Sequence, residues 1–192
     1  MDFQAMLDAL STVIAIPVTP FVRRGAEIYA DFQAYAHLVD RMVSGGIRVV
    51  TPNGNTSEFY SLTPHEMRQA LEASIAGNAG RAITLAGVGF DAATAIEMAQ
   101  FAAEKGAEAI MVHQPVVHPY RSDEGWIAYH KAIADAVPSL GVVSYVRDAT
   151  IGVAAIGGWP IAAQILSASN MPWAIRPSLA NIVQQLGKDR LA

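Results

Sequence analysis

The sequence predicts an α/β fold of the TIM, or (β/α)8, barrel type, of which this chain supplies about six βα units. Two observations carry the prediction. Apolar, β-branched segments alternate with segments of helical period about every 30 residues, a pattern typical of parallel strands joined by helices. The strand segments are apolar throughout rather than alternating, so both faces of the sheet are expected to be covered.

The predicted elements alternate along the whole chain. Thr63 and Glu66 form a capping box at the start of one helix, with Pro64 at its first position, and Gly106 ends the next helix. Helices are expected over residues 2–11, 31–44, 64–77, 92–105, 123–136, 157–168 and 179–187. Strands are expected over residues 13–21, at the start of the stretch 47–63, and over 82–89, 109–115, 141–148 and 173–177.

Two architectures accommodate these parallel units, a barrel and a doubly wound open sheet. The G-x-G-x-x-G motif that usually announces the open sheet is missing after the first strand. A barrel of eight units typically needs about 250 residues, whereas this chain has 192. We therefore expect a single partial barrel domain over residues 1–192, truncated at its C-terminal end.

The composition limits the classes of function. Apolar residues make up 52% of the chain and charged residues 16%, so general disorder is excluded. The net charge of −4, without a basic cluster, predicts no nucleic-acid partner. There is no cysteine, no apolar stretch long enough to span a membrane and no signal peptide at the N-terminus. A cytoplasmic protein that does not bind a membrane is expected.

A polar cluster after the second strand is the first candidate site. Gly54 allows a tight turn or the close approach of a ligand, and Asn55, Thr56 and Ser57 supply short hydrogen-bonding side chains. Because a parallel strand delivers such groups to the carboxyl edge of the sheet, we expect a binding site there. An ordinary turn is the alternative.

Several motifs resemble the dihydrodipicolinate synthase and N-acetylneuraminate lyase family. The resemblance spans about residues 13–176, and Glu58-Phe59 together with the Y-x-R-D segment after the fifth strand is more like the 5-dehydro-4-deoxyglucarate dehydratase branch. The segments that carry it are Val18-Thr19-Pro20-Phe21, Gly54-Asn55-Thr56-Ser57-Glu58, Leu62-Thr63-Pro64-His65-Glu66, Ala86-Gly87-Val88-Gly89 and Tyr145-Val146-Arg147-Asp148.

The resemblance implies a TIM barrel that assembles as a tetramer or dimer. It also implies class I aldolase chemistry on pyruvate, a related 2-keto acid or a sugar acid, with no metal and no organic cofactor. In the family pattern, Tyr145 is the general acid/base, and Thr56 binds the keto-acid carboxylate and relays a proton to Tyr145. Gly54, Asn55 and Arg147 are the further substrate-binding candidates.

The sequence departs from this family at the nucleophile. A Schiff base needs a primary amine that can lose its proton, and the family places a lysine on the sixth strand. Here Arg176 occupies that place, and a guanidinium remains protonated and cannot form the imine. Val116-Val117 stand where the family has paired tyrosines. We expect Arg176 to bind a carboxylate or an enolate oxygen as a fixed cation instead.

The sequence is also compatible with two other functions. The chain could be a non-catalytic homologue that binds a small carboxylate or serves only in assembly. Alternatively, His113 and His118, with Glu58 and Asp148 on other strand ends, could hold a divalent metal, although their spacing is a poor signal. The remaining histidines fall on predicted helices and are expected to face solvent: His37, His65 and His130.

Overall fold

The computed structural model describes residues 3–115 and 123–145. The expected elements over 157–187, and the candidate residues Arg147 and Arg176, lie outside the described residues, as do His118 and Asp148. The described helices are α1 (Phe3–Leu10), α2 (Phe32–Ser44), α3 (Pro64–Asn78), α4 (Ala92–Lys105) and α5 (Asp123–Ala136), with a short 3₁₀ helix η1 (Asn55–Ser57). The strands are β1 (Ile14–Ala15), β2 (Phe21–Arg24), β3 (Glu27–Ala30), β4 (Val49–Val50), β5 (Ile83–Val88), β6 (Ala109–Val112) and β7 (Gly141–Ser144).

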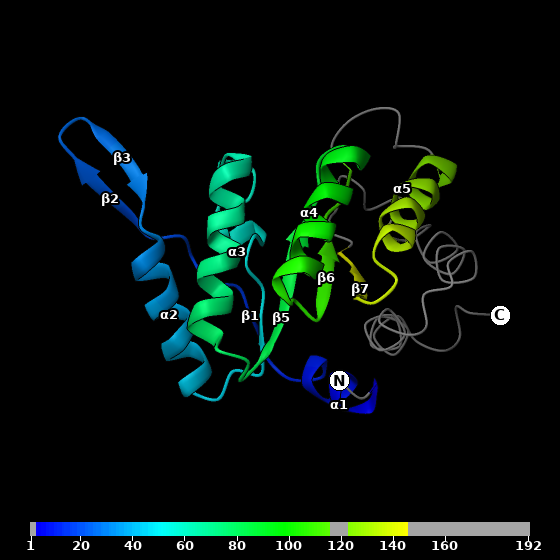
Figure 1. Cartoon of the computed structure of the whole chain (residues 1–192), viewed down its shortest axis with the longest axis horizontal. Coiled ribbons are helices and arrows are strands. Elements are labelled where there is room, and N and C mark those ends of the chain that lie inside the picture. Colours follow the sequence, from blue (N-terminus) through cyan, green and yellow to red (C-terminus); the bar gives the residue numbers. More distant parts are fainter. Residues whose placement is uncertain (1–2, 116–122, 146–192) are drawn as a thin grey trace, which may run out of the picture.

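Five of the strands form one parallel sheet in the order β1-β4-β5-β6-β7. Each strand pairs with the next strand of the sheet in chain order, as in a (β/α)8 barrel, and α2, α3, α4 and α5 follow one another across the sheet (Figure 1). The described residues therefore form the predicted part of a TIM barrel. Their carboxyl ends lie at one common edge, which we call the carboxyl edge.

Alternate strand residues pack into two different cores. Residues of the first set pack with Met6 and Ala9 of α1, on the side that faces the barrel interior: Val49, Ile83, Leu85, Ala109, Met111, Val143 and Tyr145. Residues of the second set pack against α4 and α5 on the outer face: Ala86, Val88, Ile110, Val112 and Val142. Both faces of the sheet are covered, as the uninterrupted apolar strands predict.

The helix boundaries follow from the capping residues. Thr63 and Glu66 form the predicted capping box of α3, with Pro64 as its first residue. Asp91 caps α4 by accepting a hydrogen bond from the backbone N–H of Thr94 at 3.1 Å. Gly106 ends α4 in the left-handed conformation that glycine favours. None of the helices in the described part of the chain is long and apolar enough to cross a membrane.

The prediction of a first strand over 13–21 was too long. Only Ile14–Ala15 joins the sheet, because Pro17 and Pro20 have no backbone N–H to donate to a neighbouring strand. Phe21 instead begins an antiparallel hairpin, β2–β3, that sequence analysis missed and that projects beyond α2 (Figure 1). Its two-residue loop starts with Gly25 at φ +66°, the position that needs a glycine in one of the common hairpin turns.

The expectation for His130 was also wrong. His37 and His65 are exposed, whereas His130 is completely buried between α5 and the outer face of the sheet. Its Nδ1 lies 2.9 Å from the carbonyl oxygen of Trp126, and its Nε2 lies 3.0 Å from Oγ of Ser144 on β7. Because a carbonyl oxygen only accepts, Nδ1–H donates to Trp126 and the Ser144 hydroxyl donates to Nε2. Burial lowers the pKa of His130 to about 4.

Candidate active site

The polar cluster after β4 lies at the carboxyl edge, as predicted. Gly54 is buried and has φ −80°, a conformation that any residue adopts, so a tight turn is not the reason for a glycine. A Cβ at this position would lie 2.6 Å from Cγ2 of Ile16 in the segment that follows β1. The glycine therefore allows the chain after β4 to pack closely against the chain after β1.

Ser57 has a structural role in this cluster. Its hydroxyl donates to the carbonyl oxygen of Pro17 at 2.5 Å, and the hydroxyl of Thr19 donates to the carbonyl oxygen of Ser57 at 2.7 Å. Thr56 is exposed on η1, and Asn55 is half-buried with its Oδ1 buried and without a partner among the described residues. Two reciprocal bonds thus fix the motif and leave Asn55 and Thr56 available to a ligand.

Tyr145 follows β7 at the same edge. Its backbone N–H donates to the carbonyl oxygen of Val112 at 3.0 Å, which extends the pairing of β7 with β6 by one residue. Its half-buried side chain packs with the interior cluster rather than with the outer helices. Within the described part of the chain, no hydrogen bond joins Tyr145 to Thr56, so the structure places the two on one edge without linking them.

His113 is the residue beside Tyr145 on the neighbouring strand. Val112 of β6 pairs with Ser144 of β7, so the next residues, His113 and Tyr145, stand at the same level of the sheet. Both side chains face the barrel interior, because residues two positions earlier, Met111 and Val143, do so. The two rings meet edge to face, with their centroids 6.0 Å apart.

The protonation of His113 follows from its hydrogen bond. Its Nε2 lies 2.8 Å from the carbonyl oxygen of Asn53, which can only accept, so Nε2 carries the hydrogen and Nδ1 keeps a lone pair. That Nδ1 is buried and has no partner among the described residues. The side chain is 1% exposed, and burial lowers the pKa of His113. The imidazole is therefore neutral at pH 7.

Two glycines of the β5 segment make room for this histidine. A Cβ on Gly87 would lie 2.1 Å from the carbonyl oxygen of Asn53 and 3.0 Å from Nε2 of His113. A Cβ on Gly89 would lie 3.0 Å from Cβ of His113 and 3.1 Å from the ring of Phe59. Phe59 stacks on the imidazole, with ring centroids 4.1 Å apart and planes 21° from parallel. The Gly-x-Gly segment thus serves to position the His113 ring.

The two described lysines lie on the outer helices, as expected. Nζ of Lys105 pairs with Glu72 at 2.7 Å, and Lys131 pairs with Asp135 one turn later on α5. Neither is at the carboxyl edge, so neither is placed to act as a Schiff-base nucleophile there. Among residues 3–115 and 123–145, no three histidine, aspartate or glutamate side chains gather as a metal site would require.

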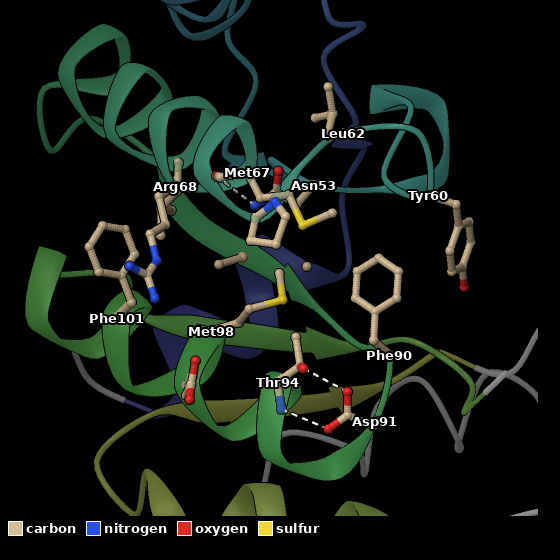
Figure 2. Close-up of a pocket in the computed structure, with 15 residues that line it drawn as sticks. Asn53, Tyr60, Leu62, Met67, Arg68, Phe90, Asp91, Thr94, Met98 and Phe101 are labelled. Atoms are coloured by element: carbon tan, nitrogen blue, oxygen red, sulfur yellow. Dashed lines mark hydrogen bonds between the residues drawn. The ribbon is translucent and has the colours of Figure 1, made fainter. Parts of the chain in front are cut away.

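A cavity of about 320 Å³ lies outside the barrel interior, between the beginnings of α3 and α4. Met67 and Arg68 of α3 face Thr94 and Met98 of α4 across it, and Asn53 lies at its inner end (Figure 2). The Nδ2 of Asn53 donates to the carbonyl oxygen of Met67 at 3.1 Å. The candidate residues Gly54, Asn55, Thr56 and Tyr145 do not line this cavity, whereas Asn53 and Gly87, which contact His113, do.

Comparison with known proteins identifies the family. The sequence profile described as the dihydrodipicolinate synthetase family matches residues 9–156, most of the chain and all of the described sheet. This chain belongs to the dihydrodipicolinate synthetase family. The predicted resemblance is thereby confirmed, and the likeness to the 5-dehydro-4-deoxyglucarate dehydratase branch is supported by the relatives that follow.

Relatives with two different names match this family member. The probable 5-dehydro-4-deoxyglucarate dehydratase 1 of Streptomyces coelicolor is 32% identical over 144 residues, which are 75% of this chain and 44% of that protein. The 4-hydroxy-tetrahydrodipicolinate synthase of Phenylobacterium zucineum is 35% identical over 136 residues, which are 70% of this chain and 42% of that protein. The chain thus spans less than half the length of these relatives.

A solved structure confirms the fold. The crystal structure of dihydrodipicolinate synthase from Bacillus clausii superimposes with a TM-score of 0.68 and 38% sequence identity, covering 74% of this chain and 47% of that one. The dihydrodipicolinate synthase structure from Oceanobacillus iheyensis gives 0.69 and 37%, covering 78% and 48%. The partial TIM barrel predicted from the sequence is therefore the fold of this chain.

Sequence analysis assigned His113 only to a possible metal site and missed its place beside Tyr145. A signal for it was present. His113 and Tyr145 each follow an apolar run on consecutive predicted strands, and residues at the ends of adjacent parallel strands are neighbours. Gly87 and Gly89, two residues apart on the strand before, mark a strip of the interior face without side chains. Together these features predict that the side chain of His113, which follows β6, fills this strip.

Proposed function

We propose that this chain is part of a lyase or dehydratase that acts on a 2-keto acid or a sugar acid at the carboxyl edge. The observation that carries the proposal is the position of Tyr145, whose phenol faces the barrel interior on the edge that also bears the 54–58 motif. A phenol with a pKa near 10 can move protons at neutral pH when a hydrogen-bonding partner stabilises its charged form. Tyr145 is the proposed general acid/base.

The substrate-binding groups are proposed on the same edge. Asn55 through its amide N–H groups and Thr56 through its hydroxyl donate to the substrate carboxylate, with Gly54 holding their backbone in place. Arg147 is a further candidate for that carboxylate. The relatives named 5-dehydro-4-deoxyglucarate dehydratase favour a sugar acid that loses water. Assembly as a homo-oligomer, tetramer or dimer, is part of this proposal.

Arg176 sets this proposal apart from Schiff-base chemistry. A guanidinium stays protonated in proteins and cannot become an imine, but it holds a carboxylate or a developing enolate oxygen by paired hydrogen bonds. Lys105 and Lys131 are engaged with carboxylates on the outer helices, which supports the view that no described lysine takes over. The reaction would then proceed through a bound enolate rather than a covalent intermediate.

The test combines turnover with trapping. The purified protein is incubated with pyruvate and with 5-dehydro-4-deoxyglucarate, with and without borohydride, and its mass and the products are read by mass spectrometry. We expect loss of water from the sugar acid and no covalent adduct. In the variant Tyr145→Phe, we expect turnover to fall by about 100-fold or more, whereas the exposed-helix variant His37→Phe should retain it. A borohydride-trapped adduct would show that Schiff-base chemistry persists.

A non-catalytic homologue is the second candidate, and it is favoured by the combined replacement of the nucleophile by Arg176 and of the paired tyrosines by Val116-Val117. Calorimetric titration separates the two. Heat on binding pyruvate or a sugar acid, without product from any substrate, would leave a carboxylate-binding protein. No heat from any of these ligands would leave a role in assembly alone.

A further inference from the structure

His113 has the features of a working base rather than of a core side chain. It is as buried as the apolar residues around it, yet one of its two nitrogens has no partner among the described residues. An unpaired polar atom in the interior costs on the order of 1–3 kcal/mol. His113 stands at the carboxyl edge, where the proposed site lies, so its unpaired nitrogen is placed to meet a ligand.

The surroundings of His113 hold its ring in one orientation. The carbonyl oxygen of Asn53 accepts from Nε2–H at 2.8 Å, and Phe59 covers one ring face at 4.1 Å. Asn53 itself has φ +59°, a conformation uncommon outside glycine, which turns this carbonyl group over Gly87. Several elements thus combine to fix the imidazole, and in residues 3–115 and 123–145 none of them uses Nδ1, which remains an acceptor.

Two phenols with an exchangeable proton lie beside the His113 ring, Tyr60 with ring centroids 5.9 Å apart and Tyr145 on the neighbouring strand of the sheet. The Tyr145 ring meets the imidazole edge to face at 6.0 Å, and no hydrogen bond within the described residues uses its hydroxyl. Apo sites often show catalytic hydrogen bonds that close only when substrate binds, directly or through one water. The phenol of Tyr145 can donate and Nδ1 of His113 can accept, so the two could form such a hydrogen bond when substrate binds.

We propose that His113 is a catalytic residue of this chain, whose Nδ1 exchanges a proton with Tyr145 and with the substrate across the ends of β6 and β7. The proposal rests on the proposed function. It gives this chain a proton partner for Tyr145 that does not depend on a threonine hydroxyl. It also replaces the metal-ligand reading of His113 with a role in proton transfer.

The proton movements balance for loss of water from a hydroxylated keto acid. The phenol gives its proton to Nδ1, which produces a phenolate and an imidazolium whose Nε2–H still donates to Asn53. The phenolate takes the proton from the carbon next to the carbonyl group. The electron pair of that C–H bond moves into the bound enolate. The enolate then re-forms its carbonyl group and expels the hydroxyl group of the next carbon, which leaves as water with the imidazolium proton. Tyr145 and His113 are then neutral again.

The first test needs no turnover. In protein labelled with ¹⁵N-histidine, the two ring nitrogens of His113 are assigned by long-range correlation spectra. We expect the Nε2–H form, with an unprotonated Nδ1 whose chemical shift changes when Tyr145 is replaced by phenylalanine. His65, exposed on α3, is the internal control and should not change. A protonated Nδ1, or a His113 spectrum that is the same in Tyr145→Phe, would overturn the proposal.

The second test uses the reaction. His113→Phe keeps an aromatic ring on Phe59 but removes the base, and we expect kcat to fall by about 100-fold or more, with KM changed far less. His113→Gly should regain at least tenfold of the lost activity when free imidazole is added, a response that a packing role would not give. The matched control is His130→Phe, another buried histidine, which imidazole should not affect.

The outcomes separate the two proposals. Turnover by the wild-type protein that survives in folded His113→Phe overturns the role of His113 and leaves the proposed function intact. No turnover by the wild-type protein with any keto acid or sugar acid overturns the proposed function, and the catalytic role of His113 falls with it. In that case, the chemical-shift response to Tyr145→Phe still shows whether the two residues are coupled.

Discussion

Two buried histidines lie on opposite faces of the same sheet and differ in how their nitrogens are used. On the outer face, His130 of α5 has both nitrogens in hydrogen bonds, to Trp126 and to Ser144. On the interior face, His113 has one bond, to Asn53, and its other nitrogen has no partner within the described part of the chain. Ser144 and Tyr145 are consecutive, so the two histidines flank the end of β7. The comparison indicates that a histidine with both nitrogens in hydrogen bonds, such as His130, holds α5 against β7. A histidine with one unpaired nitrogen, such as His113, can exchange a proton.

The largest effect on stability is expected on the interior face of the sheet, where Gly87 and Gly89 lie beside His113. Gly87→Ala places a methyl group 2.1 Å from the Asn53 carbonyl oxygen, where backbone must move, and should lower the free energy of unfolding by about 3 kcal/mol. Gly89→Ala meets Cβ of His113 at 3.0 Å and the Phe59 ring at 3.1 Å, which requires much less movement than a carbonyl oxygen 2.1 Å away, so its effect should be smaller. Chemical denaturation measures both variants. Equal losses would contradict this account.

His130, on the outer face of the sheet, predicts that the free energy of unfolding depends on pH. The pKa of His130 falls from an ordinary value of 6.5 to about 4 on folding, so its contribution is complete above pH 6.5 and is lost as the pH falls toward 4. Between pH 7 and pH 5 the free energy of unfolding should drop by about 2 kcal/mol from this residue. The lowered pKa of His113 acts in the same direction.

The matched variant for this prediction is His130→Phe, which should flatten the pH dependence measured by urea denaturation at a series of pH values. The carboxyl groups of Glu66 and Asp91 have pKa values lowered by hydrogen bonds from Thr63 and Thr94. Their contributions are lost only below their ordinary values of 4.5 and 3.8, outside this range. An unchanged pH dependence in His130→Phe would show that His130 is not the group responsible.

The smallest effect on stability is expected at Ser144, and it distinguishes the structural role of His130 from the catalytic role proposed for His113. Ser144→Ala removes the hydroxyl that donates to Nε2 of His130 and should lower the free energy of unfolding by about 1 kcal/mol. Because Ser144 faces away from the interior, the hydrogen bond that is lost lies outside the proposed site, and kcat should change by no more than about twofold. Thermal denaturation and the turnover assay measure the two effects. A loss of kcat as large as that in Tyr145→Phe would place Ser144 in the site.

The elements with strong periodicity could be predicted from the sequence, and those that depend on tertiary packing could not. The helices α2 and α4 start and end where the capping residues and glycines indicate, and α3 starts at its predicted capping box but ends at Asn78, with Ala79 rather than a glycine in the left-handed conformation. The hairpin β2–β3 was missed because its residues have no regular apolar alternation and most remain exposed. The single strand predicted over 13–21 was too long, because it was extended across Pro17 and Pro20.

The candidate site was predicted in its location but not in all its members. The polar cluster at Gly54 and the phenol of Tyr145 both lie on the carboxyl edge as expected. The error at His130 was avoidable, since it belongs to the buried helical series Tyr129, His130, Ile133, Ala134 and Val137. The contact between His113 and the Asn53 carbonyl group could not be predicted, because it depends on the positive φ of Asn53.

Gly87 of β5 and Gly89 just after it have a consequence for recognising related proteins. The His113 ring occupies space that exists only because neither Gly87 nor Gly89 has a side chain. A sequence with this histidine but a larger residue at either glycine could not hold the ring in the same place, and a sequence with both glycines but a small residue at 113 would have a gap there. The three positions together therefore form a search signature for family members that share this interior arrangement, independent of overall identity.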